Sequence, residues 1–237
     1  MQRSRKSLER GSGAALPTRP AEGRADSVPL EAPAHSTAKR AFDIAFALLM
    51  LLLSSPVWVV LSLLILWEDG PPLLFAQERW GLGGRRFQVL KFRTMKRAQA
   101  GGQPATVSRA GDPRVTPVGR VLRRMGLDEL PNLLSILRGD MSLVGPRALA
   151  TDEIVLDIDP RYRSYEEVPG FRQRLSVKPG LTGLATVLLP RDASPRHRFA
   201  YDLVYIRRWS FGLDLRLVGM SVLISLLGRW EKRGRKI

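Results

Sequence analysis

An apolar run interrupted by a proline constrains the fold of this chain more than any other feature. Between Asp43 and Glu68 the chain reads IAFALLMLLLSSPVWVVLSLLILW, without a charged residue. A helix rises about 1.5 Å per residue, so an unbroken helix of this length would cross a bilayer core of roughly 30 Å. Pro56 lies near the middle, lacks an amide hydrogen and crowds the carbonyl group four residues earlier. Ser54 and Ser55 can bond the backbone groups that the proline frees, so the sequence predicts a helix broken or kinked at Ser55 and Pro56.

Basic residues flank both ends of the apolar run. Lys39 and Arg40 precede it, and the residues that follow include Arg79, Arg85, Arg86, Lys91, Arg93, Lys96 and Arg97. Cytoplasmic flanks of membrane segments carry an excess of Lys and Arg, so both ends fit the cytoplasmic side. We therefore expect a re-entrant helical hairpin over residues 39–68 that enters and leaves by one face of the membrane. A single span kinked at the proline is the alternative.

The charge of the chain indicates an anionic partner. The 237 residues carry a formal net charge of +16, which nucleic acid, anionic lipid or phosphorylated substrates would each balance. The chain has no cysteine, which excludes disulfides, a thiolate nucleophile and cysteine-bound metal. The apolar run begins far from the N-terminus and is too long for the core of a secretory signal, so no cleaved signal is expected.

The regions around the apolar run differ in composition. Residues 1–38 mix Pro, Gly, Ala, Ser and charge without apolar periodicity, which predicts a disordered basic tail. Residues 69–229 form the expected cytoplasmic, membrane-associated domain, and residues 230–237 a basic C-terminal tail. Within the domain, turn residues at 70–72 and 81–84 bound two β-prone runs, LLFAQERW and RFQVLKFRTM, which predicts a small β-hairpin. The segment QAGGQPATVSRAGDP follows and is expected to be a mobile loop.

Two helices are predicted after this loop. Val118, Val121, Leu122 and Met125 recur at helical spacing, and Gly126 is a plausible stop. A second stripe consists of Leu130, Leu133, Leu134 and Leu137. Pro131 is tolerated only in a first turn and Gly139 suits a C-terminal cap, so this helix is expected to start near Asp128.

The second helix would place Asp128 and Glu129 at its N-terminus. The helix dipole and free amide groups there favour ionised carboxylates and also attract phosphate. The alternative is that Asp128 merely caps the helix and Glu129 decorates its first turn. Basic clusters flank the acids, and the turn GDMSLVGPR adds Asp140 and Arg147. Carboxylates combined with arginines and a proline-stiffened loop are what phosphoryl transfer requires.

The C-terminal region carries a second apolar stretch, at residues 217–227. It is too short to span a bilayer, and Trp209 and Trp230 lie at its borders. An amphipathic interfacial helix and an ordinary buried helix are both compatible with this pattern. The fold class expected for the whole chain is α+β, mainly α, in a monotopic membrane protein.

Several blocks in fixed order resemble one family. They are similar to the bacterial sugar transferase family, the monotopic phosphoglycosyl transferases. In order, the blocks read KRAFDI, FAQERWGLGGRRFQVLKFRTM, DPRVTPVGRVLRRMGLDELPNLLSILRGDMSLVGPR and KPGLTGLA. The resemblance runs from about Lys39 to Leu227. It implies a re-entrant helix broken at Ser55 and Pro56, and transfer of a sugar 1-phosphate from a UDP-sugar to polyprenyl phosphate with release of UMP.

The resemblance also implies roles for single residues. Asp128 would be the nucleophile that forms a covalent phosphosugar intermediate, and Glu129 would hold the required Mg²⁺. Arg123 would contact phosphate and Arg147 the nucleotide sugar. Further substrate-binding residues are expected at Lys91, Arg93, Lys39 and Arg40, of which the last two could instead pair with anionic head groups.

The family further implies a cellular setting. The expected location is the cytoplasmic face of the bacterial inner membrane, at the first membrane step of polysaccharide or glycoconjugate synthesis. Membrane lipids and downstream glycosyltransferases would be partners. A nucleic-acid partner is not expected, because aromatic residues do not interleave with the basic clusters. A catalytically inactive membrane scaffold is the alternative to an enzyme.

This chain departs from the family pattern at several positions. Ala148 replaces the usual proline after the arginine, and Ser135 and Ile136 replace Asn-Val. The segment after KPGLTGLA reads TVLLPRD where relatives continue Gln-Val-Asn-Gly-Arg. These changes put the rigidity of the nucleotide-binding loop and the identity of the sugar in doubt, but they leave Asp128, Glu129 and Arg123 unchanged.

Overall fold

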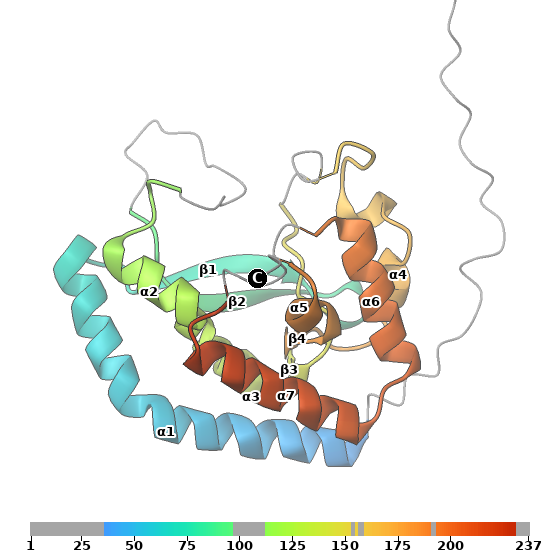
Figure 1. Cartoon of the computed structure of the whole chain (residues 1–237), viewed down its shortest axis with the longest axis horizontal. Helices are drawn as coiled ribbons and strands as arrows, with labels where there is room; N and C mark the ends of the chain where they lie inside the picture. Colours follow the sequence, from blue (N-terminus) through green and yellow to red (C-terminus); the bar gives the residue numbers. More distant parts are fainter. Residues whose placement is uncertain (1–35, 97–111, 153–154, 156–158, 191–192, 231–237) are drawn as a thin grey trace, which may run out of the picture.

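One long helix, α1 (Thr37–Asp69), runs along one side of the molecule (Figure 1). It belongs to a computed structural model that describes residues 36–96, 112–152, 155, 159–190 and 193–230. Almost all of the expected N-terminal tail, most of the expected loop before Asp112 and nearly all of the C-terminal tail lie outside the described residues. The side chain of Ser36 caps the start of α1 by accepting a hydrogen bond from the Lys39 amide at 3.1 Å, and the helix ends at Gly70.

Helix α1 bends but stays continuous through Pro56 (Figure 1). The missing amide of Pro56 would have bonded the carbonyl of Leu52, and the Ser55 hydroxyl donates to that carbonyl instead, at 2.8 Å. The predicted role of the serine is thus confirmed, whereas the predicted break takes the form of a bend. Within the described part of the chain, α1 is the one helix long and apolar enough to cross a membrane.

The predicted β-hairpin is present. Strands β1 (Leu74–Trp80) and β2 (Arg86–Phe92) pair antiparallel, with Leu74 opposite Phe92 and Trp80 opposite Arg86. A short 3₁₀ turn, η2 (Leu82–Gly84), connects them. Gly83 and Gly84 both have positive φ angles, which glycine adopts without steric cost.

Helix α2 (Pro117–Met125) matches its prediction. The side chain of Thr116 accepts a hydrogen bond from the Gly119 amide at 2.9 Å, Pro117 occupies the first turn, and Gly126 ends the helix at a φ of 72°.

The next helix starts later than predicted. Residues Leu127–Glu129 form a separate 3₁₀ turn, η3, and helix α3 (Asn132–Arg138) begins only after Pro131. The reason is local. The Leu130 amide donates a hydrogen bond to the Leu127 carbonyl, which completes the 3₁₀ turn, and Pro131 has no amide hydrogen to donate the next bond. The acidic pair therefore lies in a tight turn between two helices.

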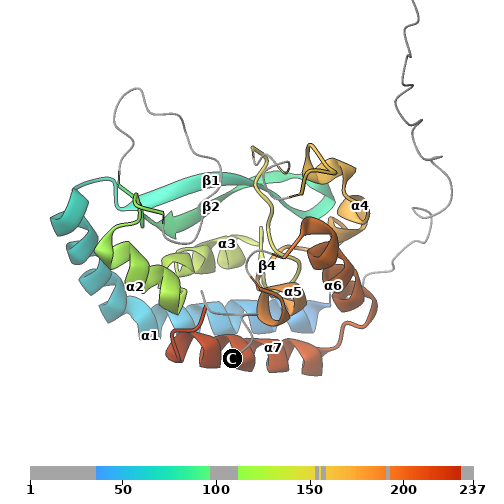
Figure 2. The same cartoon turned by 45° about the horizontal axis from the view of Figure 1, so that its top comes forward.

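The rest of the domain packs around two short parallel strands, β3 (Ser142–Val144) and β4 (Gly180–Thr182). The remaining elements are η5 (Tyr165–Glu167), α4 (Phe171–Arg174), α5 (Leu184–Leu188), α6 (Pro195–Arg207) and α7 (Phe211–Leu226). The main core joins Ile136, Val144, Tyr205 and Leu217, all fully buried. Figure 2 shows the hairpin on one side of the molecule, α1 and α7 on the other, and α3 between them.

Helix α7 combines both alternatives considered for the C-terminal apolar stretch. Asp214, Leu217 and Val218 are buried against the domain. The other side exposes apolar residues, namely Leu215, Met220, Val222, Leu223, Leu226 and Leu227. Helix α1 likewise leaves Leu52 71% and Trp67 86% exposed. Such contiguous apolar surface marks an interaction with membrane or protein rather than with water.

Candidate active site

The acidic pair Asp128 and Glu129 lies where three elements meet. Gly126 brings the chain out of α2, and a side chain there would lie 2.8 Å from the indole nitrogen of Trp230, so this turn packs closely against the C-terminal segment. On the other side, Asn132 accepts a hydrogen bond from the Leu90 amide at 3.2 Å, which ties α3 to strand β2. The turn that carries the acids is thus fixed at both ends.

Strand β2 supplies the direct partner of Glu129. The Lys91 Nζ lies 2.5 Å from Glu129 Oε1, and the two side chains are only 18% and 26% exposed. Arg147, from the loop after β3, places its Nη1 3.9 Å from the same carboxylate oxygen. Three segments distant in sequence therefore bring two cations to one carboxylate.

These contacts set the charge states of the pair. Burial alone would raise the pKa of Glu129, but the charges of Lys91 and Arg147 outweigh it and lower that pKa to about 2. Burial lowers the pKa of Lys91, and the charges of Glu129 and Asp128 offset part of this effect. Glu129 is thus ionised at neutral pH and held by a partly desolvated ammonium group.

Arg79 on strand β1 belongs to the same cluster, although the sequence analysis did not select it as a site residue. Its charge acts on both Glu129 and Lys91. Its Nη1 donates to the Ala148 carbonyl at 2.9 Å and its Nη2 to Gln77 Oε1 at 2.5 Å. The register places Arg79 opposite Phe87 and Lys91 opposite Phe75, so strand alternation puts both cations on one face. That alternation is the signal that could have found Arg79.

A small cavity adjoins this cluster. Its walls consist of Arg79, Val89, Lys91, Glu129, Asn132, Met141, Arg147, Ala148, Gly180 and Leu181. The close approach of β3 and β4 helps to form it, since a side chain at Gly180 would lie 2.1 Å from the Gly145 amide nitrogen.

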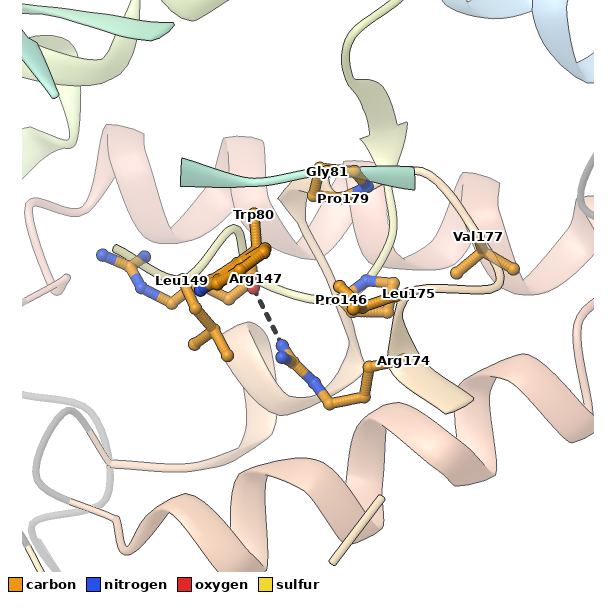
Figure 3. Close-up of a pocket in the computed structure, with 9 residues that line it drawn as sticks. All are labelled: Trp80, Gly81, Pro146, Arg147, Leu149, Arg174, Leu175, Val177 and Pro179. Carbon is orange, nitrogen blue, oxygen red and sulfur yellow. Dashed lines mark hydrogen bonds between the residues drawn. The ribbon is translucent and has the colours of Figure 1, made fainter. Parts of the chain in front are cut away.

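The loop that carries Arg147 is held from several sides despite Ala148. Figure 3 shows a second small pocket next to it, lined by residues that include Trp80, Pro146, Arg174 and Pro179. Ala148 is buried and its carbonyl accepts from Arg79. The expected loss of rigidity from the missing proline is therefore offset by side-chain hydrogen bonds.

Two of the expected substrate-binding arginines contact the protein itself. Arg93 is bonded through Nη2 to the carbonyls of Asp69 and Gly70, so it caps the end of α1. Arg123 donates to Thr94 Oγ1 at 2.8 Å, which places it beside the segment that follows β2. The contacts of Arg93 indicate a structural role at the junction of α1 and the hairpin.

Lys39 and Arg40 also have protein partners. The Lys39 Nζ lies 2.6 Å from Asp214 Oδ2, and both side chains are buried. Arg40 donates to the carbonyls of Ile136 and Leu137 at 2.6 and 2.9 Å, which caps the end of α3. Both side chains thus have acceptors within the protein.

The expected metal has a restricted set of protein ligands. No group of three potential metal-ligating side chains occurs among the residues that the structure describes. Magnesium is commonly held by one or two carboxylates together with the phosphates of a substrate, and it retains waters. A single carboxylate such as that of Glu129, which already faces Lys91 and Arg147, fits such shared coordination.

Comparison with known proteins gives a consistent identity. The family model described as "Bacterial sugar transferase" matches residues 34–228. A UDP-glucose:undecaprenyl-phosphate glucose-1-phosphate transferase from Caulobacter vibrioides is 44% identical over 199 residues, which cover 82% of this chain and 72% of that protein. The exopolysaccharide production protein ExoY from Rhizobium meliloti is 37% identical, with 83% and 89% covered.

A third relative has a different sugar in its name. A UDP-N-acetylgalactosamine-undecaprenyl-phosphate N-acetylgalactosaminephosphotransferase from Aeromonas hydrophila is 35% identical over 84% of this chain and 46% of that protein. The match to the family model covers the apolar helix, the hairpin, the acidic turn and all of α7. The chain therefore belongs to the bacterial sugar transferase family.

Proposed function

We propose that this phosphotransferase moves a sugar 1-phosphate from a UDP-sugar to polyprenyl phosphate, with release of UMP, at the first membrane step of glycan assembly. The observation that carries the proposal is the acidic turn itself. Asp128 and Glu129 sit beside Lys91, Arg79 and Arg147, in a domain whose α1 and α7 expose apolar surface. Cations around a carboxylate pair suit a pyrophosphate donor, and the apolar surface suits a lipid acceptor.

In the proposed reaction Asp128 is the nucleophile. One carboxylate oxygen attacks the phosphorus that bears the sugar, the bond from this phosphorus to the bridging oxygen breaks, and UMP leaves with the electron pair. A phosphate oxygen of the polyprenyl phosphate then attacks the same phosphorus and releases the Asp128 carboxylate. Splitting the transfer lets a soluble donor and a membrane-bound acceptor use one site in turn.

The cations address the main barrier of the first step. A carboxylate that approaches a pyrophosphate meets like charge, and positioned cations reduce that repulsion. Lys91 on β2 and Arg147 on the loop after β3 both lie beside Glu129, and each can turn toward a phosphate oxygen. Glu129 would hold Mg²⁺, which when bound would neutralise charge on the diphosphate.

The proposed orientation places the active site at the cytoplasmic face of the inner membrane. Helix α1 would enter the bilayer, bend at Ser55 and Pro56 and leave by the same face. The exposed apolar sides of α1 and α7 support this placement, since exposed apolar surface of this kind suits a membrane interface better than water. Membrane lipids would then be constant partners, and downstream glycosyltransferases would extend the lipid-linked product.

The scaffold alternative leaves the acidic turn unexplained. A scaffold would need the apolar helices and the basic surface, but not a partly desolvated Lys91 and Glu129 beside two further arginines. Holding such charges away from water costs free energy that binding or catalysis can recover.

The test is UMP release by detergent-solubilised protein supplied with polyprenyl phosphate, Mg²⁺ and a panel of UDP-sugars. The panel begins with UDP-glucose and UDP-N-acetylgalactosamine, the donors in the names of the relatives. Release with one sugar supports the proposal and identifies the donor. No release with any sugar would favour the scaffold.

A further inference from the structure

The backbone around Arg147 is held by an unusual series of hydrogen bonds. Four consecutive carbonyls, at residues 146–149, each accept one bond. The donors are, in order, the Gly180 amide at 2.9 Å, Arg174 Nη2 at 2.8 Å, Arg79 Nη1 at 2.9 Å and the Trp80 amide at 2.9 Å. Two of the four donors are arginine side chains, so the position of this loop depends on side chains as well as on the sheet.

Arg174 is the more deeply buried of these two arginines. Its Nε lies 2.7 Å from Asp202 Oδ2, and the side chains of the pair are only 3% and 2% exposed. The guanidinium carbon lies 4.2 Å from the centre of the Phe199 ring. Burial raises the pKa of Asp202, and the charge of Arg174 counteracts this rise. The ion pair joins α4 to α6, and another nitrogen of the same guanidinium, Nη2, donates to the Arg147 carbonyl.

We propose that Arg174 is a positioning residue, which fixes the main chain of Arg147 and thereby directs the Arg147 side chain to the phosphates of the nucleotide-sugar donor. The inference rests on the proposed function. Figure 3 shows Arg174 reaching the Arg147 carbonyl while the Arg147 side chain extends away from it. On that other side, Arg147 Nη1 approaches Glu129.

The chemistry of arginine explains why this residue type is required. A guanidinium group has five N–H donors in a planar fork, so it can bond Asp202 through one nitrogen and the Arg147 carbonyl through another. A lysine could keep the ion pair with Asp202, but its single nitrogen cannot occupy both positions of the fork. A buried ion pair also contributes little net stability relative to apolar residues of similar size. Positioning of Arg147 is therefore a more specific reason for the pair than stability.

The experiment compares Arg174→Lys with Arg172→Lys, a matched change at an exposed position of the same helix. UMP release gives kcat and KM for the UDP-sugar, and isothermal titration calorimetry with the same UDP-sugar gives its Kd. For Arg174→Lys we expect KM and Kd to rise about tenfold, the effect of losing one oriented charged contact, with kcat changed less. Arg172→Lys should match the wild type.

A second comparison separates positioning from general loss of structure. In an Arg147→Ala background, Arg174→Lys should cause no further rise in KM, because the side chain that it positions is absent. A merely structural role would give the same additional loss in both backgrounds. The double variant Arg174→Met with Asp202→Leu removes the buried charges together, so it should fold, and it should still show the raised KM.

The outcomes distinguish the inference from the proposed function. A wild-type protein that neither binds nor turns over any UDP-sugar would overturn both. If the wild-type protein reacts but KM is unchanged in Arg174→Lys or in the double variant, only the proposed role of Arg174 is overturned. Additive effects of Arg174→Lys and Arg147→Ala would overturn it as well.

Discussion

Lys39 Nζ and Asp214 Oδ2 lie 2.6 Å apart in the interior, although 175 positions separate the two residues in sequence. Asp214 also accepts hydrogen bonds from the Tyr205 hydroxyl at 2.9 Å and from the Trp209 indole at 3.1 Å. The start of α1 is thereby joined to α6 and α7 through one carboxylate. The two helices that expose apolar surface are thus connected by a buried polar network.

Replacing Lys39 by Met should destabilise the protein strongly. The substitution leaves Asp214 buried without its cation, a change that typically costs about 3–5 kcal/mol. Thermal unfolding in detergent measures the loss, and Lys96→Met, at an exposed lysine, is the matched control with little expected effect. If Lys39 instead served the lipid acceptor, Lys39→Met would retain stability and raise KM for polyprenyl phosphate.

The proposed re-entrant course of α1 predicts the accessibility of its two ends. The chain has no cysteine, so single cysteines can be introduced without a background. Thr37→Cys, at an exposed position at the start of the helix, and Gln88→Cys, at an exposed position after it, should react with an impermeant maleimide from the same side of sealed vesicles. Leu52→Cys, on the exposed apolar side, should react only after detergent is added. Labelling of the first two from opposite sides would show a single span.

The pH dependence of kcat/KM should report the charge of Lys91. Burial lowers the pKa of this lysine, so its ammonium form is lost at a pH below the usual lysine range of about 10.4, and activity should fall there. Lys91→Arg should move the alkaline limit upward, because arginine keeps its proton. Lys91→Met should lower kcat/KM by about 10²–10³ at all pH values.

The lowered pKa of Glu129 leads to a prediction for the acid side of the pH dependence of kcat/KM. Its pKa is lowered to about 2, so the stabilising ion pair with Lys91 is complete above the ordinary glutamate pKa of about 4.3 and is lost as the pH falls toward 2. Glu129 should therefore not limit activity between pH 5 and 8. If kcat/KM falls on the acid side of this range and still does so in Glu129→Gln, another group causes the fall. If the fall disappears in Glu129→Gln, Glu129 itself titrates there, which would contradict its lowered pKa.

Local features of the fold were predictable from the sequence. Thr116 and Gly126 bound α2 as their capping preferences require, and the glycines at 83 and 84 turn the hairpin. The Ser55 hydroxyl replaces the donor that Pro56 lacks. Each of these features depends on residues within a few positions of one another, so the necessary information is contiguous. The start of α3 was misplaced because Leu127–Glu129 closed its own turn ahead of Pro131.

Long-range pairings were not predictable in the same way. Nothing near Lys39 indicates that its partner is Asp214, or that Arg174 pairs with Asp202. The same holds for Arg93, whose place at the end of α1 depends on how the hairpin packs against that helix. Lys39 and Arg93, which were expected to bind substrate, thus have acceptors within the protein. The role of such residues is decided by packing, which a sequence pattern does not encode.

The most direct test of the account is whether Asp128 carries the sugar phosphate. Protein is incubated with Mg²⁺ and a UDP-sugar labelled at the phosphate next to the sugar, without polyprenyl phosphate, and its intact mass and bound label are measured. If Asp128 carries the sugar phosphate, the wild type takes up stoichiometric label with release of UMP, and Asp128→Asn takes up none. The wild type then loses the label when polyprenyl phosphate is added. Two results would contradict this role of Asp128. One is UMP that forms only when polyprenyl phosphate is present, with no labelled protein, and the other is label that persists in Asp128→Asn.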